Sequence, residues 1–231
     1  MSKKNVCVAF DLDDTLYLER DYAISGFRAV GEWCAEKLGV EGIQDRARAL
    51  FALGRRGDIF DAVLDQLGVE CDSRTVSAMV KVYREHIPCI RLLPDALECL
   101  ARLQERVHLA LLTDGNPISQ RAKIKALELS DRFDAIVVTG DWGHEYFKPH
   151  VRGYRYLESK LRSCSGRFVY VADNPSKDFF ALRSLGWNAI RVRRPKSLHE
   201  DTECSSGLVH AEVPSLEPVP HLVSEMYFIE L

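Results

Sequence analysis

Hydrophobic positions follow two different patterns along this chain, and the change of pattern divides it into separate parts. An apolar run at 6–10 is rich in β-branched and aromatic residues and ends at an acidic turn, which predicts a buried strand. From about 19 to 87, apolar residues recur every three or four positions, the spacing of helices that bury one face. The first helix is expected to end at Gly39, and the others lie near 43–53, 58–67 and 73–86.

From 88 onward, helical periodicity alternates with short apolar runs. Helices are predicted near 95–104, 117–128, 150–162 and 176–184, and strands near 107–112, 135–138, 168–171 and 188–192. Strands joined by helices of this length need crossover connections, which give a mostly parallel sheet with helices on both faces. We therefore expect an α/β protein with a Rossmann-like parallel sheet.

The helical stretch interrupts this α/β pattern after its first strand, so we interpret it as an inserted domain. The predicted boundaries are 1–18 and 88–231 for the core and 19–87 for the insert, with seams near 17–20 and 88–93. From about 195 to 220 the chain is polar and contains four prolines, which predicts an extended tail over the surface. The last residues fit a short helix that packs back.

The composition of the chain indicates which kinds of binding partner are expected. The chain is 46% hydrophobic and 28% charged, and its net charge of −3 arises from charges spread along the sequence. We therefore expect no nucleic-acid partner and no membrane partner, since no stretch approaches the ~18 apolar residues of a membrane span. The seven cysteines are an odd number without CxxC spacing, which favours reduced thiols and the cytoplasm. A monomer or a homodimer is expected.

Polar side chains occur just where the predicted strands end. Asp11 and Asp13 follow the first strand, Thr113, Asp114 and Gly115 the second, and Asp173, Asn174 and Asp178 the fourth, while Lys148 lies on the loop after the third. In an open α/β sheet, ligands bind beyond the carboxyl ends of the strands. These side chains are therefore expected to face one pocket.

The residue types in this pocket suit phosphoryl chemistry. Asp11, Asp13 and Asp173 place three acids together, and a hard cation such as Mg²⁺ resolves their repulsion. Lys148 adds a positive charge and Thr113 a hydroxyl donor. The backbone N–H groups of Leu12, Asp114 and Gly115 complete a cradle for a tetrahedral dianion. A carboxylate can attack phosphorus in such a site and form an aspartyl-phosphate.

Four segments in order resemble the motifs of the haloacid dehalogenase-like hydrolases. Phe10-Asp11-Leu12-Asp13-Asp14-Thr15-Leu16-Tyr17 resembles the first, Leu112-Thr113-Asp114-Gly115-Asn116 the second, Lys148-Pro149 the third and Val171-Ala172-Asp173-Asn174-Pro175-Ser176-Lys177-Asp178 the fourth. The likeness spans about 6 to 192. It implies that the helical insert is a cap of the family's first position, the C1 type.

The resemblance also implies roles for individual residues. Asp11 would be the nucleophile and a Mg²⁺ ligand, and Asp13 the general acid/base that holds the metal through its backbone carbonyl. Thr113 and Lys148 would hold the phosphoryl group, and Asp173 would bind the metal. Asp178 and Asn174 would orient these groups from behind, with Asp178 pairing with Lys148. The acid at position 13 favours phosphatases over dehalogenases, because a leaving alkoxide needs a proton.

Some positions depart from the family pattern, and several functions stay open. Asp114 adds a negative charge where many relatives carry Asn or Ser, and Ala172 replaces the usual Gly. Tyr17 and Trp142 are expected to be packing residues. The predicted activity is hydrolysis of a small phosphorylated metabolite, a phosphate monoester that the sequence does not identify. The alternatives are a phosphomutase, a 2-haloacid dehalogenase, a receiver-like domain and a scaffold without turnover.

Overall fold

The computed structural model describes residues 5–70 and 72–231. The chain divides into two compact units, one formed by 1–19 with 91–231 and the other by 20–90. None of the helices in these described ranges combines the length and apolar character that a membrane span requires. The six described cysteines are free thiols, and Cys71 lies outside the described residues.

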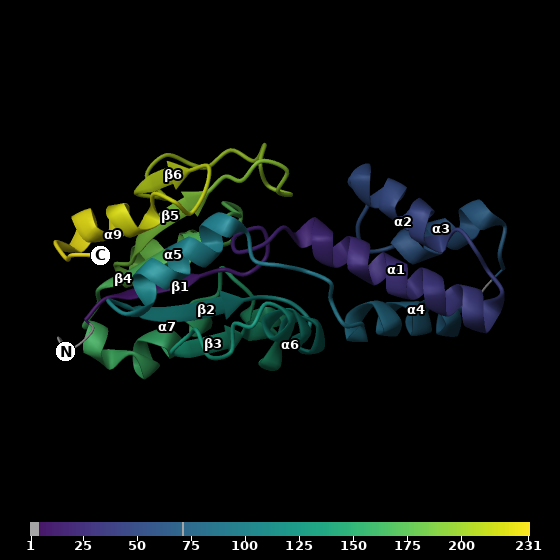
Figure 1. Ribbon diagram of the computed structural model, residues 1–231, viewed down its shortest axis with the longest axis horizontal. Helices are drawn as coiled ribbons and strands as arrows, with labels where there is room; N and C mark the ends of the chain where they lie inside the picture. The colour runs from purple at the N-terminus through teal and green to yellow at the C-terminus, as the bar shows by residue number, and fades with distance from the viewer. Residues whose placement is uncertain (1–4, 71) are drawn as a thin grey trace. The chain divides into compact units, whose positions relative to one another are not determined.

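A six-stranded sheet forms the centre of the first unit (Figure 1). Its strands are β1 Cys7–Phe10, β2 His108–Thr113, β3 Ala135–Val138, β4 Phe168–Ala172, β5 Asn188–Val192 and β6 Ala211–Val213. They lie in the order β3-β2-β1-β4-β5-β6, and every neighbouring pair is parallel. The predicted α/β class with a Rossmann-like parallel sheet is therefore confirmed. Strand order reverses between β1 and β4, which is where such sheets open a crevice for ligands.

The register of the sheet decides which side chains meet at this crevice. Phe10, the last residue of β1, pairs with Leu111 of β2 and with Val171 of β4. Asp11 continues this ladder, because its N–H donates to the Val171 carbonyl at 2.9 Å. The chain positions directly after β1 and β4 therefore lie side by side at the carboxyl edge of the sheet.

Helices cover both faces of the sheet. Figure 1 shows α5 (Pro94–Gln104) and α9 (Val219–Tyr227) over one face, and α7 (Arg152–Lys160) over the other. On the α7 side, small residues of β1 and β2 leave room for large aromatic rings. The buried rings there are Tyr154, Phe168, Tyr170, Phe179 and Trp187.

Helix α8 (Phe180–Leu185) begins four residues later than the predicted 176, and that boundary was wrong. The preceding residues form a loop held by side chains instead. The Asn174 carboxamide oxygen accepts from the Ser176 N–H at 2.9 Å, and Asp178 Oδ2 accepts from the Asn174 N–H at 3.1 Å. Short polar side chains compete in this way with helical hydrogen bonds. Helix α7 also begins later than predicted, at Arg152.

The segment after β5 is not simply an extended surface tail, so this prediction needs correction. Residues Ala211–Val213 form β6, which pairs with β5 and extends the sheet. Val213, Leu216 and Val219 are buried, and the expected final helix is α9. The few apolar residues between the prolines were enough to dock the segment on the sheet edge.

The second unit contains only helices in its described part, as its periodicity predicted. They are α1 Glu19–Leu38, which begins at the last residue of the first unit, α2 Ile43–Ala52, α3 Ile59–Leu67 and α4 Ser73–Glu85. Phe27, Ile43, Val63 and Met79 lie in its hydrophobic core. Helix α1 is followed by Gly39, whose φ of 66° lies in the left-handed region that glycine adopts readily. The role of this unit as a cap stays a prediction.

Candidate active site

Lys148 lies between two buried carboxylates. Its Nζ is 2.7 Å from Asp11 Oδ1 and 2.7 Å from Asp178 Oδ1, and it donates to the Tyr170 hydroxyl at 3.0 Å. Burial alone would lower the pKa of this amine, but Asp11 and Asp178 together raise it well above its ordinary value. Lys148 is therefore a fixed positive charge that neutralises part of the charge on Asp11.

Three carboxylates form a compact acidic cluster around this lysine. Asp11, Asp173 and Asp178 each offer an oxygen within 4.8 Å of the others, and all three side chains are buried. Burial raises the pKa of Asp11 to about 6, although Lys148 opposes this shift. Burial and the nearby Asp178 and Asp11 raise the pKa of Asp173 well above its usual range. The cluster thus contains more carboxylates than Lys148 alone can neutralise, and Lys177 opposes part of the rise in the pKa of Asp11 and Asp173.

The cluster has the properties of a site for a hard cation. Among the described residues, Asp173 Oδ2 is buried and has no hydrogen-bond partner. A buried acceptor without a donor is costly, and a bound cation would satisfy it. Asp11 and Asp173, two of the predicted ligands, fit a Mg²⁺ ion. Asp178, which the sequence predicted to pair with Lys148, lies in the same cluster and contacts that lysine. Ligation by the Asp13 backbone carbonyl stays a prediction.

The Asp13 side chain faces a different set of partners from Asp11. Its Oδ1 accepts from Lys123 Nζ at 2.7 Å and from the Tyr17 hydroxyl, and its Oδ2 accepts from Gln120 Nε2 at 2.9 Å. Burial favours the neutral acid, but Lys123 and these hydrogen bonds lower the pKa of Asp13 below its ordinary value. The carboxylate is consequently ionised and held at both oxygens.

Thr113, the last residue of β2, lies beside the Asp13 carboxylate, and Asp114 stabilises the loop that carries Lys148. Gln120 Nε2 donates to Thr113 Oγ1 at 2.5 Å. Asp114 Oδ1 accepts from Thr139 Oγ1 at 2.7 Å and from the Lys148 N–H at 3.2 Å. The extra acid at position 114 thus has a structural use, and Lys177 Nζ lies 3.4 Å from its other oxygen.

Three more predicted residues shape the backbone of the site. Gly115 has a φ of 126°, a conformation that side chains rarely allow, so the turn after Thr113 favours glycine. Asn174 fixes the loop after β4, and its Nδ2 lies 2.9 Å from His199 Nε2. Leu12 is fully buried, which anchors the backbone between Asp11 and Asp13.

Sequence reasoning missed the polar residues of α6 (Pro117–Ala126). Gln120 and Lys123 lie three positions apart and therefore share one face of this helix. Both are buried, where an amphipathic helix usually presents apolar residues. Polar residues at positions of α6 where apolar residues are expected were therefore the sequence signal that could have indicated a functional role. Tyr17 is a buried packing residue as expected, but its hydroxyl also contacts Asp13.

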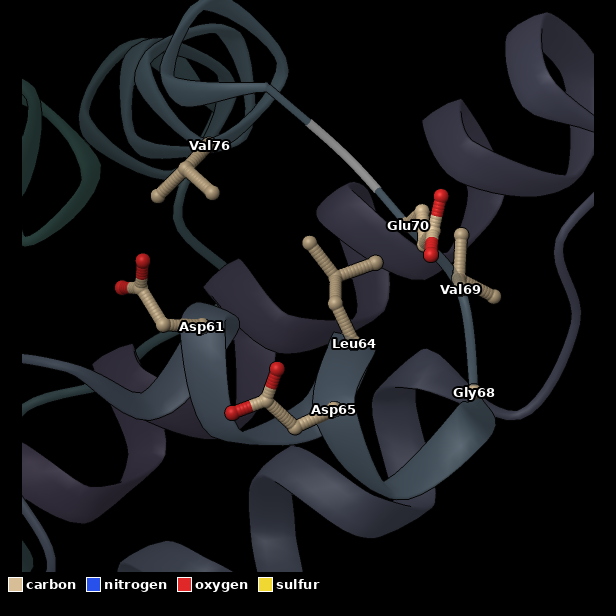
Figure 2. Close-up of a pocket in the computed structure, with 7 residues that line it drawn as sticks. All are labelled: Asp61, Leu64, Asp65, Gly68, Val69, Glu70 and Val76. Carbon is tan, nitrogen blue, oxygen red and sulfur yellow. The ribbon is translucent and has the colours of Figure 1, made fainter.

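A pocket in the second unit contains none of these residues (Figure 2). It has a volume of about 520 Å³ and is lined by Asp61, Leu64, Asp65, Gly68, Val69, Glu70 and Val76. These residues belong to α3, α4 and the connection between them. The predicted site residues gather instead at the carboxyl edge of the sheet.

A parallel sheet with a buried, lysine-paired aspartate where its strand order reverses is the arrangement of an α/β protein with a ligand site at its carboxyl edge. The sequence profile of the haloacid dehalogenase-like hydrolases matches residues 6–186. The chain therefore belongs to this family of hydrolases, as its four motifs indicated.

Three curated relatives illustrate the range of activities among similar proteins. A glyceraldehyde 3-phosphate phosphatase of Methanocaldococcus jannaschii is 24% identical, with 88% of this chain and 92% of the relative covered. A phosphoserine phosphatase of Thermus thermophilus is 30% identical, with 86% and 92% covered. An (S)-2-haloacid dehalogenase of Xanthobacter autotrophicus is 30% identical, but only 57% of this chain and 49% of that enzyme are covered.

Solved structures agree on the fold. A magnesium-bound hydrolase of this family from Bacillus subtilis superposes with a TM-score of 0.69, covering 96% of this chain and 99% of that one. Its sequence is only 18% identical, so the likeness concerns the fold alone.

Proposed function

We propose that this protein is a Mg²⁺-dependent phosphatase that hydrolyses a small-molecule phosphate monoester through phosphorylation of Asp11. The observation that carries the proposal is the placement of two motif-one carboxylates in different surroundings. Asp11 lies in the acidic cluster with Lys148, whereas Asp13 is held by Lys123, Gln120 and Tyr17. We assign Asp11, which lies beside Lys148 and the proposed metal, to nucleophilic attack, and Asp13, which has other partners, to proton transfer.

Asp11 is suited to attack phosphorus because the buried amine of Lys148 compensates the negative charge of its carboxylate. Lys148 neutralises part of the repulsion between the carboxylate and a phosphate dianion. The Thr113 hydroxyl and the N–H groups of Leu12, Asp114 and Gly115 are the donors that we assign to the phosphate oxygens. The bond that forms joins an Asp11 oxygen to phosphorus, and the bond that breaks joins phosphorus to the alkoxide.

Asp13 supplies the proton transfers. It gives a proton to the departing alkoxide and later takes one from the water that attacks phosphorylated Asp11. The hydrogen bonds of this structure favour the ionised form, which is the form that accepts a proton. A phosphate dianion beside the carboxylate raises its pKa and favours the protonated form needed for donation.

We assign the metal to Asp11 and Asp173, with the Asp13 backbone carbonyl as a third ligand. The buried, unpartnered Asp173 Oδ2 supports this assignment. When bound, Mg²⁺ withdraws negative charge from the phosphoryl oxygens. Asp178 also pairs with Lys148 Nζ, which helps to keep that amine beside Asp11.

The dehalogenase alternative is disfavoured by Asp13, because release of a halide requires no proton. Two relatives that match most of this chain are named as phosphatases of three-carbon phosphates, which makes such esters the first substrates to test. The phosphomutase alternative uses the same nucleophile but returns the phosphoryl group to its substrate.

One set of assays separates these functions. Purified protein with Mg²⁺ is incubated with a panel of phosphorylated metabolites, a pair of isomeric sugar phosphates and a 2-haloacid. We expect released inorganic phosphate, no isomer and no halide, and we expect Asp11→Asn to remove all phosphate release. Isomer formation without phosphate release would favour the phosphomutase, and halide release would favour the dehalogenase.

A further inference from the structure

Two side chains of α6 reach the Asp13 carboxylate from a buried position. Lys123 Nζ lies 2.7 Å from Asp13 Oδ1, and Gln120 Nε2 lies 2.9 Å from Oδ2. The Lys123 side chain is 5% exposed and that of Asp13 is 20% exposed. Each carboxylate oxygen therefore has its own donor, and the plane of the carboxylate is fixed against rotation.

From this geometry we infer that Lys123 and Gln120 are positioning residues that set the location of Asp13 for proton transfer. The inference rests on the proposed phosphatase function and deepens it. It extends the functional site onto α6, beyond the second motif, which ends at Asn116. Neither residue is assigned to contact the substrate.

A structural role alone explains this arrangement poorly. Burying an amine requires a charged or polar partner, and an apolar residue would pack the helix against the sheet at lower cost. Gln120 also donates to Thr113 Oγ1 at 2.5 Å, so one carboxamide joins the proton-transfer group to the proposed phosphate ligand. A single helical face thus fixes the distance between two groups that act on the same ester.

The consequence concerns the leaving group. Misplacing a reacting group by ~1 Å costs on the order of 10²-fold in rate. An alkyl phosphate depends on proton donation from Asp13, whereas nitrophenolate leaves without a proton. Loosening Asp13 should therefore slow an alkyl phosphate more than nitrophenyl phosphate.

The test is a double-mutant cycle with full-length protein, Mg²⁺ and both esters. Lys123→Met should lower kcat on the alkyl ester ~10–10²-fold and on nitrophenyl phosphate several times less. In an Asp13→Asn background the same substitution should cost less than about threefold, because there is no acid left to position. Lys123→Arg should recover part of the loss. Lys125→Met is the matched control, since Lys125 lies exposed on the same helix and should match the wild type.

Other outcomes overturn the inference. Equal losses on both esters, or a Lys123→Met loss that is just as large in the Asp13→Asn background, would show a general effect on the fold. Gln120→Met serves as a second variant that removes no charge, and it should show the same leaving-group dependence. Wild-type protein without phosphatase activity on any ester would overturn the proposed function together with this inference.

Discussion

Lys148 and Asp178 form an ion pair in which both side chains are buried, with Nζ 2.7 Å from Oδ1. The same amine lies 2.7 Å from Asp11. Asp178 therefore shares its partner with the proposed nucleophile and determines where the positive charge lies. Removing one member of a buried pair typically costs ~3–5 kcal/mol, because the other charge is left uncompensated.

Asp178→Asn should separate this electrostatic role from packing. The amide keeps an oxygen that can accept from the Asn174 N–H but loses the charge that faces Lys148. We expect a lower melting temperature and a loss of kcat on the order of 10²-fold, since a displaced Lys148 misplaces Asp11. Thermal unfolding and steady-state kinetics measure both effects. The exposed Asp201→Asn serves as the control, and an Asp178→Asn enzyme with wild-type kcat would contradict this role.

The two motif-one aspartates should differ in the step that they support. Asp11→Asn should prevent formation of any phosphorylated enzyme, because a carboxamide is a poor nucleophile. Asp13→Asn should still be phosphorylated but turn over ~10²–10⁴-fold more slowly. Acid quenching followed by mass spectrometry detects the phosphorylated peptide. Finding phosphate on the Asp11→Asn protein would place the nucleophile elsewhere.

The acidic cluster predicts how pH and Mg²⁺ act together on stability. Burial raises the pKa of Asp11 from 3.8 to about 6, so the folded metal-free protein keeps a proton that the unfolded chain has lost in that window. The unfolded state then binds fewer protons, and the free energy of unfolding falls as pH rises through this range. Asp173, whose pKa burial also raises, acts in the same direction.

Mg²⁺ competes with these protons, so its stabilising effect should grow with pH. We expect a larger rise of the melting temperature on adding Mg²⁺ at about pH 7.5 than at about pH 5. Calorimetry of the wild type and of Asp173→Asn, with and without the metal, measures the difference. A shift that is independent of pH, or equal in the variant, would contradict metal binding at this cluster.

Much of this architecture was predictable because its signals are local. The strand at Cys7–Phe10 and the acidic turn after it are contiguous in sequence, and strand ends in a parallel sheet meet at one edge. The Lys148 contact with Asp178 was also expected from the motifs. By contrast, Lys123 meets Asp13 across 110 positions of sequence, and only the docking of α6 on the sheet brings them together.

The predicted boundaries of helices and strands were wrong in two situations. In one, side chains compete with the backbone for hydrogen bonds, and in the other, a few apolar residues decide the packing. The sequence of the loop at Asn174 and Asp178 predicts the start of a helix, because Asn and Ser are common at helix N-termini. In the structure, the side chains of Asn174 and Asp178 accept hydrogen bonds from the backbone and close a turn instead. Strand β6 spans only Ala211–Val213, too short for a pattern of alternation to emerge. Its place is set by pairing with β5, which is information outside the segment itself.

The connection between the two units allows the cap hypothesis to be tested directly. The Leu93 N–H donates to the Leu16 carbonyl at 3.0 Å, so the two chain segments that lead out of the first unit lie side by side. A short glycine-rich linker in place of residues 20–90 can therefore join them.

The first unit retains its own sheet and buried core, so we expect the shortened protein to fold and to bind Mg²⁺ with beryllium fluoride. The cap hypothesis predicts that it loses substrate discrimination and most turnover, because a cap would keep water from the phosphoryl site. Phosphate release across the same metabolite panel measures this, and a shortened protein with the parent's substrate preference would show that residues 20–90 do not select the substrate.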